Sequence, residues 1–300
     1  MTHKHDSSHA APNFSRAFAI GVALNLGYVL VQVVFGIFGH SLALIADAGH
    51  NFGDVLGLML AWGASYLAKR PSTVRRTYGW RRTSIMAALF NAIFLLVAVG
   101  AIAWEAARRF GHHEAVNANV VIWVAAGGII INGLTAWLFW SGRKTDLNIR
   151  GAFLHMGADA AVSAGVVVAG LVIRFTGWSW LDPLTSIIIS IVIVVGTLGL
   201  LRESFDLALD AVPPGVDLLK VKNYLSGLPD VTAVHDLHIW AMSTTEVALT
   251  AHLVMPGRSG DDAFLHEICD HLHRAFGIEH STVQIEQSAH SCALAPDVVD

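Results

Sequence analysis

Two pairs of ionisable residues with the same spacing stand inside apolar segments of the chain. His50 and Asp54 interrupt one such segment, and His155 and Asp159 interrupt another. An ionisable group in hydrocarbon costs several kcal/mol, so such residues mark functional sites when they lie inside membrane segments. On a helix, residues four apart are rotated by only about 40° and project from one face. Each pair can therefore present two ligand atoms together.

Two helices of this kind, side by side, would offer two imidazoles and two carboxylates. Four nitrogen and oxygen donors without a thiolate suit Zn²⁺ or a similar divalent transition metal. With the metal bound, the site is formally neutral, whereas the empty site holds two close carboxylates and favours proton uptake. Because the ligands must lose protons to bind metal, zinc and protons compete for the same atoms. An antiporter follows if both forms cross between inward-facing and outward-facing states.

The composition indicates a membrane protein. Of the 300 residues, 54% are hydrophobic and 14% are charged, whereas a soluble domain usually carries roughly 25% charged residues. Uncharged runs of about 20 residues are long enough to span a bilayer. The chain has six largely apolar segments of this length, at residues 15–38, 42–67, 83–108, 118–141, 150–175 and 181–205, and the second and fifth carry several ionisable residues in their interior. We therefore predict an all-α bundle of six transmembrane helices within residues 15–210.

The positions of lysine and arginine predict the orientation of the bundle. Cytoplasmic loops carry an excess of these residues. The loops after the second and fourth segments are the most basic, with Lys69, Arg70, Arg75, Arg76, Arg81 and Arg82 in one and Arg143, Lys144 and Arg150 in the other. Both loops are expected to be cytoplasmic, which places both termini in the cytoplasm. The N-terminal tail, residues 1–14, carries histidines at His3, His5 and His9.

A change in composition at Pro213-Pro214 opens a second domain, residues 213–290, followed by a tail at 291–300. Apolar periodicity predicts a helix, two strands, a helix and a strand in this domain. The segments are 216–228, 231–242, 247–255, 261–276 and 281–286. This αββαβ order predicts a small cytoplasmic α+β domain with both helices on one face of the sheet.

Several motifs occur in order on the expected segments: Asp47-Ala-Gly-His50-Asn-Phe-Gly-Asp54, Tyr78-Gly-Trp-Arg, Asn91, His155-Met-Gly-Ala-Asp159, Asp182-Pro183 and Val234-His235-Asp-Leu-His238-Ile-Trp240. Through them the chain resembles the cation diffusion facilitator family of zinc-type cation efflux antiporters. The resemblance implies export of Zn²⁺ from the cytoplasm against protons, with Cd²⁺ or Co²⁺ as further substrates, and it implies a metal site formed by His50, Asp54, His155 and Asp159. It also implies a homodimer, a metallochaperone-like cytoplasmic domain and a location in a bacterial inner membrane. No organic cofactor is expected.

The resemblance assigns roles to further residues. Asp47 stays near the face of His50, as a supporting acceptor or as part of a proton route. A regulatory zinc site in the cytoplasmic domain is implied at His235, His252, His266 and Glu286. Arg82 and Asp210 match a charge interlock that joins the membrane and cytoplasmic domains across the dimer.

Other classes of function use the same residue types. A membrane metalloenzyme or a metal sensor could hold zinc on the His and Asp cluster, but a catalytic zinc keeps one position open for water. The protease pattern His-Glu-x-x-His is not met at His266-Glu267, because His271 follows at the wrong spacing. A haem protein with His50 and His155 as axial ligands would leave both aspartates unexplained. The charge pattern shows no footprint of nucleic-acid binding.

Overall fold

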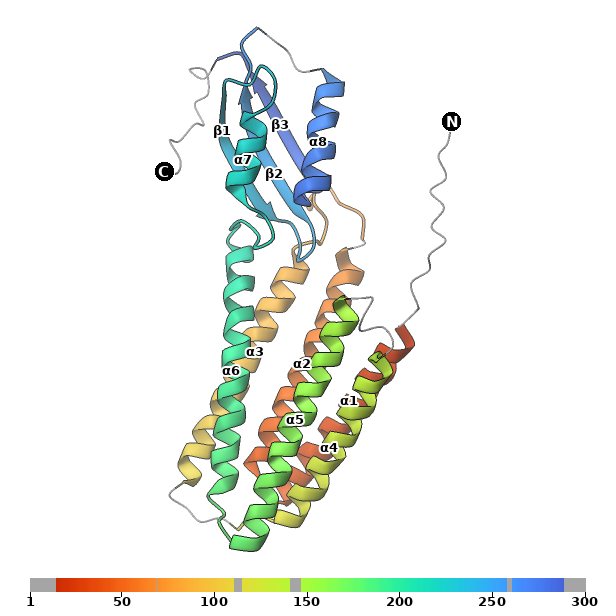
Figure 1. Cartoon of the computed structure of the whole chain (residues 1–300), viewed down its shortest axis with the longest axis vertical. Helices are drawn as coiled ribbons and strands as arrows, with labels where there is room; N and C mark the ends of the chain where they lie inside the picture. Colours follow the sequence, from red (N-terminus) through yellow and green to blue (C-terminus); the bar gives the residue numbers. More distant parts are fainter. Residues whose placement is uncertain (1–14, 69, 111–114, 141–146, 258–260, 289–300) are drawn as a thin grey trace. The chain divides into compact units, whose positions relative to one another are not determined.

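Six long helices occupy the six apolar segments that the sequence predicts. The computed structural model describes residues 15–68, 70–110, 115–140, 147–257 and 261–288, so the two predicted tails lie outside the described residues. The helices are α1 (Ser15–Phe38), α2 (Leu42–Ala68), α3 (Thr83–Arg109), α4 (Ala118–Phe139), α5 (Leu147–Thr176) and α6 (Leu181–Ala208) (Figure 1). The helical class of this part of the chain is therefore confirmed.

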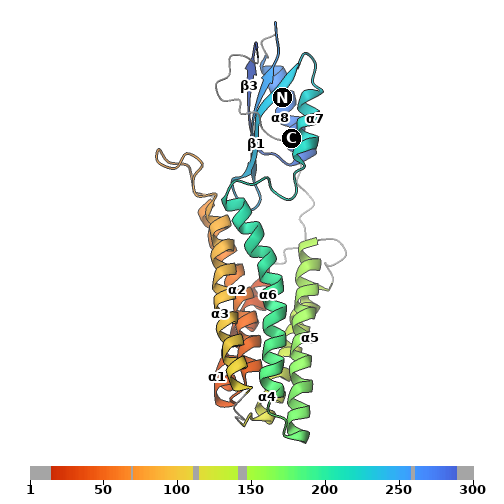
Figure 2. The ribbon, with the colours of Figure 1, turned by 90° about the vertical axis from the view of Figure 1, so that its left-hand side faces the viewer.

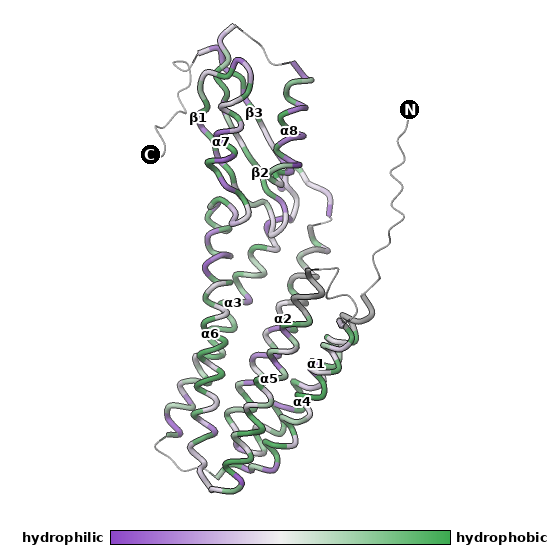
Figure 3. Tube along the Cα trace, in the orientation of Figure 1, coloured by the Kyte–Doolittle hydropathy of each residue, from purple (hydrophilic) through white to green (hydrophobic). Residues whose placement is uncertain are grey.

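Five of the described helices are long and apolar enough to cross a membrane, namely α1, α3, α4, α5 and α6. The chain is thus an integral membrane protein. Helix α2 is long enough but not among the five, because Asp47, His50, Asn51 and Asp54 lower its hydropathy. Figure 3 shows hydrophilic stretches along α2 among apolar ones. That α2 is a sixth transmembrane span remains a prediction.

The chain divides into two compact units, and the first comprises residues up to Leu58 together with Asn91–Leu198. Its buried core consists of small and branched side chains from five helices: Ala43, Leu44, Ala46, Val99, Val121, Ala125, Val166, Ile189 and Ile193. Small residues allow helix backbones to approach closely, which favours helix association in lipid. This packing holds α2 and α5, the two helices that carry the His and Asp pairs, in one bundle.

The start of α2 is fixed by a side chain from α6. Asp182 is 1% exposed and accepts a hydrogen bond from the Ser41 hydroxyl. Its other oxygen accepts the backbone N–H of Leu42 at 2.7 Å. The first N–H groups of a helix have no partner within the helix, and a carboxylate there satisfies them and complements the helix dipole. Asp182 therefore caps α2 from another helix and fixes the end nearest to His50.

The glycine at position 53 lets α2 approach α3. A Cβ added at Gly53 would overlap the side chain of Leu95, whereas one added at Gly63 of the same helix would meet no atom within 4 Å. Leu95 is buried at 7% exposure. The backbone at Gly53 lies one residue before Asp54, so this close approach also sets the position of a predicted ligand.

We expect Gly53→Ala to destabilise the protein by about 1–3 kcal/mol, because overpacking a close helix contact forces neighbouring side chains to move. Gly63→Ala is the matched control, and the higher helix propensity of alanine should leave it neutral or more stable by up to about 1 kcal/mol. Thermal unfolding of both purified variants measures the difference. Equal midpoints for the two variants would show that the α2–α3 approach does not depend on Gly53.

The second unit comprises Met59–Phe90 and the chain from Gly199 onward. It contains α7 (Leu218–Ser226), β1 (Ala233–Ala241), β2 (Val247–Val254), α8 (Asp262–Phe276) and β3 (His280–Glu286), which confirms the αββαβ order. Strand β2 is central, antiparallel to β1 and parallel to β3. Figure 2 shows α7 and α8 on one face of this sheet.

The core of the α+β domain follows from amphipathic helices laid on a sheet. Val221 and Leu225 of α7 and Ile268 and Leu272 of α8 are fully buried against strand residues such as Leu253. Both helices begin at an aspartate whose side chain accepts hydrogen bonds from the first turn, and α8 ends at a glycine with a φ of 66°. Such caps satisfy the free backbone groups of helix ends.

Candidate metal centre

The four predicted ligands of the transport site converge in the first unit. His50 Nε2 lies 3.1 Å from Asp159 Oδ1, and His155 Nε2 lies 3.2 Å from Asp54 Oδ2. Within the pairs, His50 Nδ1 is 3.8 Å from Asp54 Oδ2 and His155 Nε2 is 3.7 Å from Asp159 Oδ2. Each histidine thus contacts a carboxylate of its own helix and one of the other helix.

These distances suit a tetrahedral ion. Zinc bonds to His nitrogen and Asp oxygen are about 2.0–2.2 Å long, which separates neighbouring ligand atoms by about 3.3–3.6 Å. His50, Asp54 and Asp159 each offer an atom within 4.8 Å of the others. His155 is not in this group of three, but its Nε2 lies near both carboxylates and its ring meets that of His50 edge to face at 6.0 Å between centroids; its role as a fourth ligand stays a prediction.

The two carboxylates each keep an oxygen available for a cation. Asp54 Oδ2 and Asp159 Oδ2 are buried, and their contacts among the described residues are with histidine nitrogens of the same cluster at 3.2–3.8 Å. A buried carboxylate oxygen without a donor is costly unless a cation or proton neutralises it. The Asp159 side chain is 2% exposed, whereas that of His155 is 43% exposed. The cluster is therefore buried at Asp159 and open at His155.

Asp47 does not belong to this ligand group, and its hydrogen bonds connect α2 to α1 and α5. It is fully buried, and its Oδ2 accepts hydrogen bonds from Gln32 Nε2 of α1 at 2.5 Å and from Ser163 Oγ of α5 at 3.4 Å. Asn51 donates to Gln32 Oε1 at 3.2 Å. The sequence interpretation missed Gln32 and Ser163. Their signal is that each is a polar residue on the buried side of an otherwise apolar segment.

A second cluster lies in the α+β domain. His235 Nε2 is 3.0 Å from Glu286 Oε2, and His252 Nδ1 is 2.9 Å from Glu286 Oε1. The three residues offer ligand atoms within 4.8 Å of one another, and Glu286 and His252 are buried. His266, the fourth residue implied by the resemblance, lies exposed on α8 and is not in this group.

Asp236 is a further member that the sequence interpretation missed. Its Oδ2 lies 3.3 Å from His252 Nε2, and its Oδ1 lies 2.9 Å from His238 Nε2. A regular strand would point Asp236 away from His235. The pairing of β1 with β2 is irregular between His235 and His238, and Asp236 has a φ of 48°. This bulge turns the carboxylate toward His252.

Arg82 Nη2 contacts Asp210 Oδ1 within one chain, and the charge interlock across a dimer stays a prediction. Next to it, Arg81 Nη1 lies 3.3 Å from Glu246 Oε1, and the backbone N–H of Thr244 donates to Ser84 Oγ at 3.1 Å. The start of α3 is therefore bound to the β1–β2 turn as well as to the segment after α6.

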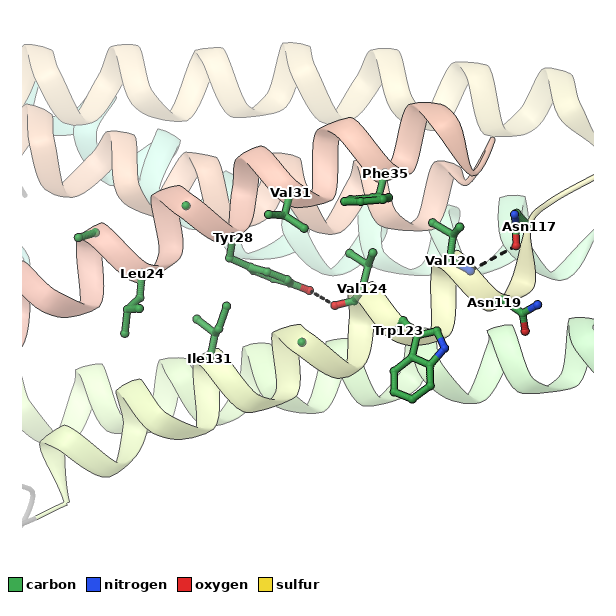
Figure 4. Close-up of a pocket in the computed structure, with 13 residues that line it drawn as sticks. Leu24, Tyr28, Val31, Phe35, Asn117, Asn119, Val120, Trp123, Val124 and Ile131 are labelled. Carbon is green, nitrogen blue, oxygen red and sulfur yellow. Dashed lines mark hydrogen bonds between the residues drawn. The ribbon is translucent and has the colours of Figure 1, made fainter.

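An apolar groove of about 730 Å³ lies between α1 and α4 (Figure 4). Tyr28 donates to the carbonyl of Val124 at 3.1 Å inside it, and Asn117 caps α4 at one end. None of the four candidate ligands lines this groove. An apolar lining without carboxylates does not bind a metal ion, so the groove is separate from the metal centre.

Comparisons with known proteins identify the family of the chain. Residues 18–207 match the family model of the cation efflux transmembrane domain, and residues 213–288 match that of the cation efflux protein, cytoplasmic domain. The chain is 35% identical to zinc transporter ZitB of Escherichia coli over 95% of this chain and 92% of the relative.

Two other relatives are similarly close in length and sequence. The metal cation efflux system protein CzcD of Cupriavidus metallidurans is 36% identical over 95% of this chain and 89% of its own. The cadmium, cobalt and zinc/H(+)-K(+) antiporter of Bacillus subtilis is 32% identical over 92% of this chain and 90% of its own. With two family models covering most of its length, the chain belongs to the cation efflux family of membrane metal transporters.

Proposed function

We propose that this protein exports Zn²⁺ from the cytoplasm in exchange for protons by alternating access, for metal homeostasis or resistance. The observation that carries the proposal is the convergence of His50, Asp54, His155 and Asp159 from two helices, with contacts of 3.1–3.8 Å. The relatives named as zinc transporter and as zinc/H(+)-K(+) antiporter support the same substrate and a coupled exchange.

The charges of the four ligands explain how metal and protons would exchange. Two carboxylates neutralise the ion while two neutral histidines add nitrogen ligands, so the loaded site has no net charge. When the metal leaves, the two carboxylates are left without a counter-charge. The carboxylates and imidazoles then take up protons, which neutralise the negative charge in place of the metal. Either form can then cross between states that face the two sides of the membrane, whereas the empty, charged form is disfavoured in low dielectric.

The donor set favours zinc among divalent ions. Imidazole nitrogens and monodentate carboxylates in a four-ligand group suit Zn²⁺, and they also accept Co²⁺ and Cd²⁺. Mn²⁺ prefers oxygen ligands in a larger set. The name of the Bacillus subtilis relative supports cadmium or cobalt as further substrates. We therefore place zinc first, with Cd²⁺ and Co²⁺ as secondary substrates.

The proposal also covers the setting of the transporter. The basic loops support a cytoplasmic position for both termini and the α+β domain, and the bacterial relatives support a bacterial inner membrane. We assign homodimerisation to the α+β domain, which matches the family model of the cation efflux protein's cytoplasmic domain. His235, His252 and Glu286 would hold a regulatory Zn²⁺ there, and Asp236 would act as an additional carboxylate.

Zinc flux in proteoliposomes tests the proposed function. Protein reconstituted with a pH gradient should move Zn²⁺, and an excess of Cd²⁺ or Co²⁺ should compete more strongly than an excess of Mn²⁺. Movement of Mn²⁺ in preference to Zn²⁺ would overturn the substrate assignment. If zinc binds but no metal moves, the metal sensor becomes the better account of the same cluster.

We expect Arg82→Ala to slow zinc transport about twofold to fivefold while zinc affinity changes less than twofold. The pair with Asp210 is about half exposed, at 53% and 52%, so it contributes at most about 1 kcal/mol of stability and acts by joining the domains. Arg274→Ala, which breaks the exposed pair with Asp270 on α8, is the matched control and should transport normally. An equal loss in both variants would show that the Arg82 pair has no special role.

A further inference from the structure

The loop between α2 and α3 carries several basic residues, and only some of them form ion pairs with carboxylates of the described residues. Residues 69–82 contain six Lys and Arg residues and no Asp or Glu. Arg81 and Arg82 have carboxylate partners. Among the described residues, Arg70, Arg75 and Arg76 have no carboxylate within 4 Å, and all three are exposed. Three of the loop's cations are therefore available for an anionic partner.

The loop is held in a defined conformation. Thr73 and Arg76 exchange two backbone hydrogen bonds of 3.0 Å, and Thr73 Oγ1 accepts the Arg76 N–H at 3.1 Å. Gly79, at a φ of 69°, donates its N–H to the Arg76 carbonyl at 3.0 Å. This turn fixes the backbone that carries Arg75 and Arg76, so less entropy is lost when they bind a ligand.

Apolar and aromatic side chains accompany the three arginines. Val74, at the tip of the turn, is fully exposed at 102%. The Arg76 guanidinium lies 3.9 Å from the centre of the Trp80 ring, and that of Arg70 lies 6.0 Å from Tyr66. Figure 2 shows the loop standing out to one side of the start of α3. Aromatic residues and Arg side chains at helix ends are typical of the interface between water and lipid.

We propose that Arg70, Arg75 and Arg76 form a binding site for the phosphate groups of anionic phospholipids in the surrounding membrane. Guanidinium groups bind phosphate oxygens through paired N–H donors. Clusters of basic residues next to a transmembrane helix attract anionic headgroups by about 1 kcal/mol per residue. If the loop served only to set the orientation of the chain in the membrane, the number of positive charges would be sufficient. The hydrogen-bonded turn, its exposed apolar tip and the aromatic rings next to the arginines are not needed for orientation, but they suit contact with a lipid surface.

Native mass spectrometry of the purified full-length protein with added phosphatidylglycerol or phosphatidylcholine tests this site. The protein should bind phosphatidylglycerol more tightly than phosphatidylcholine. Arg75→Gln with Arg76→Gln should weaken phosphatidylglycerol binding by about tenfold or more and leave phosphatidylcholine binding unchanged. Arg75→Lys with Arg76→Lys should bind phosphatidylglycerol with an intermediate affinity, because the charges remain but the paired N–H donors of the guanidinium groups are lost.

Arg174→Gln is the matched control, because it removes an exposed arginine from the end of α5 without touching the loop. It should bind phosphatidylglycerol like the parent. Unchanged thermal unfolding without lipid would show that the Gln variants are folded. Equal phosphatidylglycerol affinity in parent and double Gln variant would overturn the proposal. So would displacement of the lipid by equimolar glycerol phosphate, which would identify a site for soluble phosphates instead.

Discussion

Replacing Asp159 by asparagine is expected to lower the rate of zinc transport at least about 100-fold. Removing a residue that merely orients a metal ligand costs about 10- to 100-fold in affinity or activity, and a ligand itself should cost no less. Asp159 is 1% exposed and lies within reach of both histidines. Asparagine keeps the shape of the side chain but removes its charge, so the loaded site would carry an excess positive charge in low dielectric. Zinc uptake into proteoliposomes measures the effect.

Thermal unfolding provides a second measurement of the same variant. Relief of repulsion between two close carboxylates should make Asp159→Asn at least as stable as the parent without metal. Zinc at 100 times its Kd should stabilise the parent by about 2.7 kcal/mol and the variant by much less. Glu105→Gln, which removes a carboxylate paired with two arginines at the end of α3, should transport normally. A transporting Asp159→Asn protein would remove Asp159 from the ligand set.

Zinc affinity should fall steeply as the pH drops below the imidazole range. Protons and Zn²⁺ compete for the two histidines, so protonation can only weaken zinc binding. Two histidines that must each lose a proton give up to about a 100-fold change in zinc affinity per pH unit where both are protonated in the free protein. At pH values where both are neutral, the affinity should level off. Zinc titrations by calorimetry across this range measure the slope.

His155→Gln separates the contribution of one histidine. With only His50 left to titrate, the slope where the histidine is protonated should fall to about tenfold per pH unit, on top of a lower affinity at every pH. His238→Gln, which alters an exposed histidine of the α+β domain, should leave the slope at the transport site unchanged. A pH-independent affinity in the parent would contradict competition between zinc and protons at these ligands.

The sequence predicts the elements of this fold well, because apolar runs and strand patterns are local properties. The spacing of His50 and Asp54, and of His155 and Asp159, also predicts which side chains share a helix face. That the two helices lie side by side was inferred from the chemistry of four ligands. In the structure, the contacts between His50 and Asp159 and between His155 and Asp54 bring the pairs together.

Features that depend on contacts between distant segments were not predictable. Asp182 caps α2 across 140 residues of sequence, and nothing in its local pattern indicates that partner. Asp236 approaches His252 only because the pairing of β1 with β2 is irregular. Gln32 supports Asp47 from another helix. In each case tertiary packing selects the partner, whereas sequence periodicity reports only which face a residue occupies.

Zinc-driven proton flux in proteoliposomes is the most direct test of the proposed exchange. The intact protein, His155→Ala and Asp159→Ala are reconstituted with a pH-sensitive dye inside the vesicles, and zinc is added outside. The proposed function predicts proton movement opposite to zinc in the intact protein and none in either variant. Zinc movement without proton movement, or full proton flux in either variant, would contradict it.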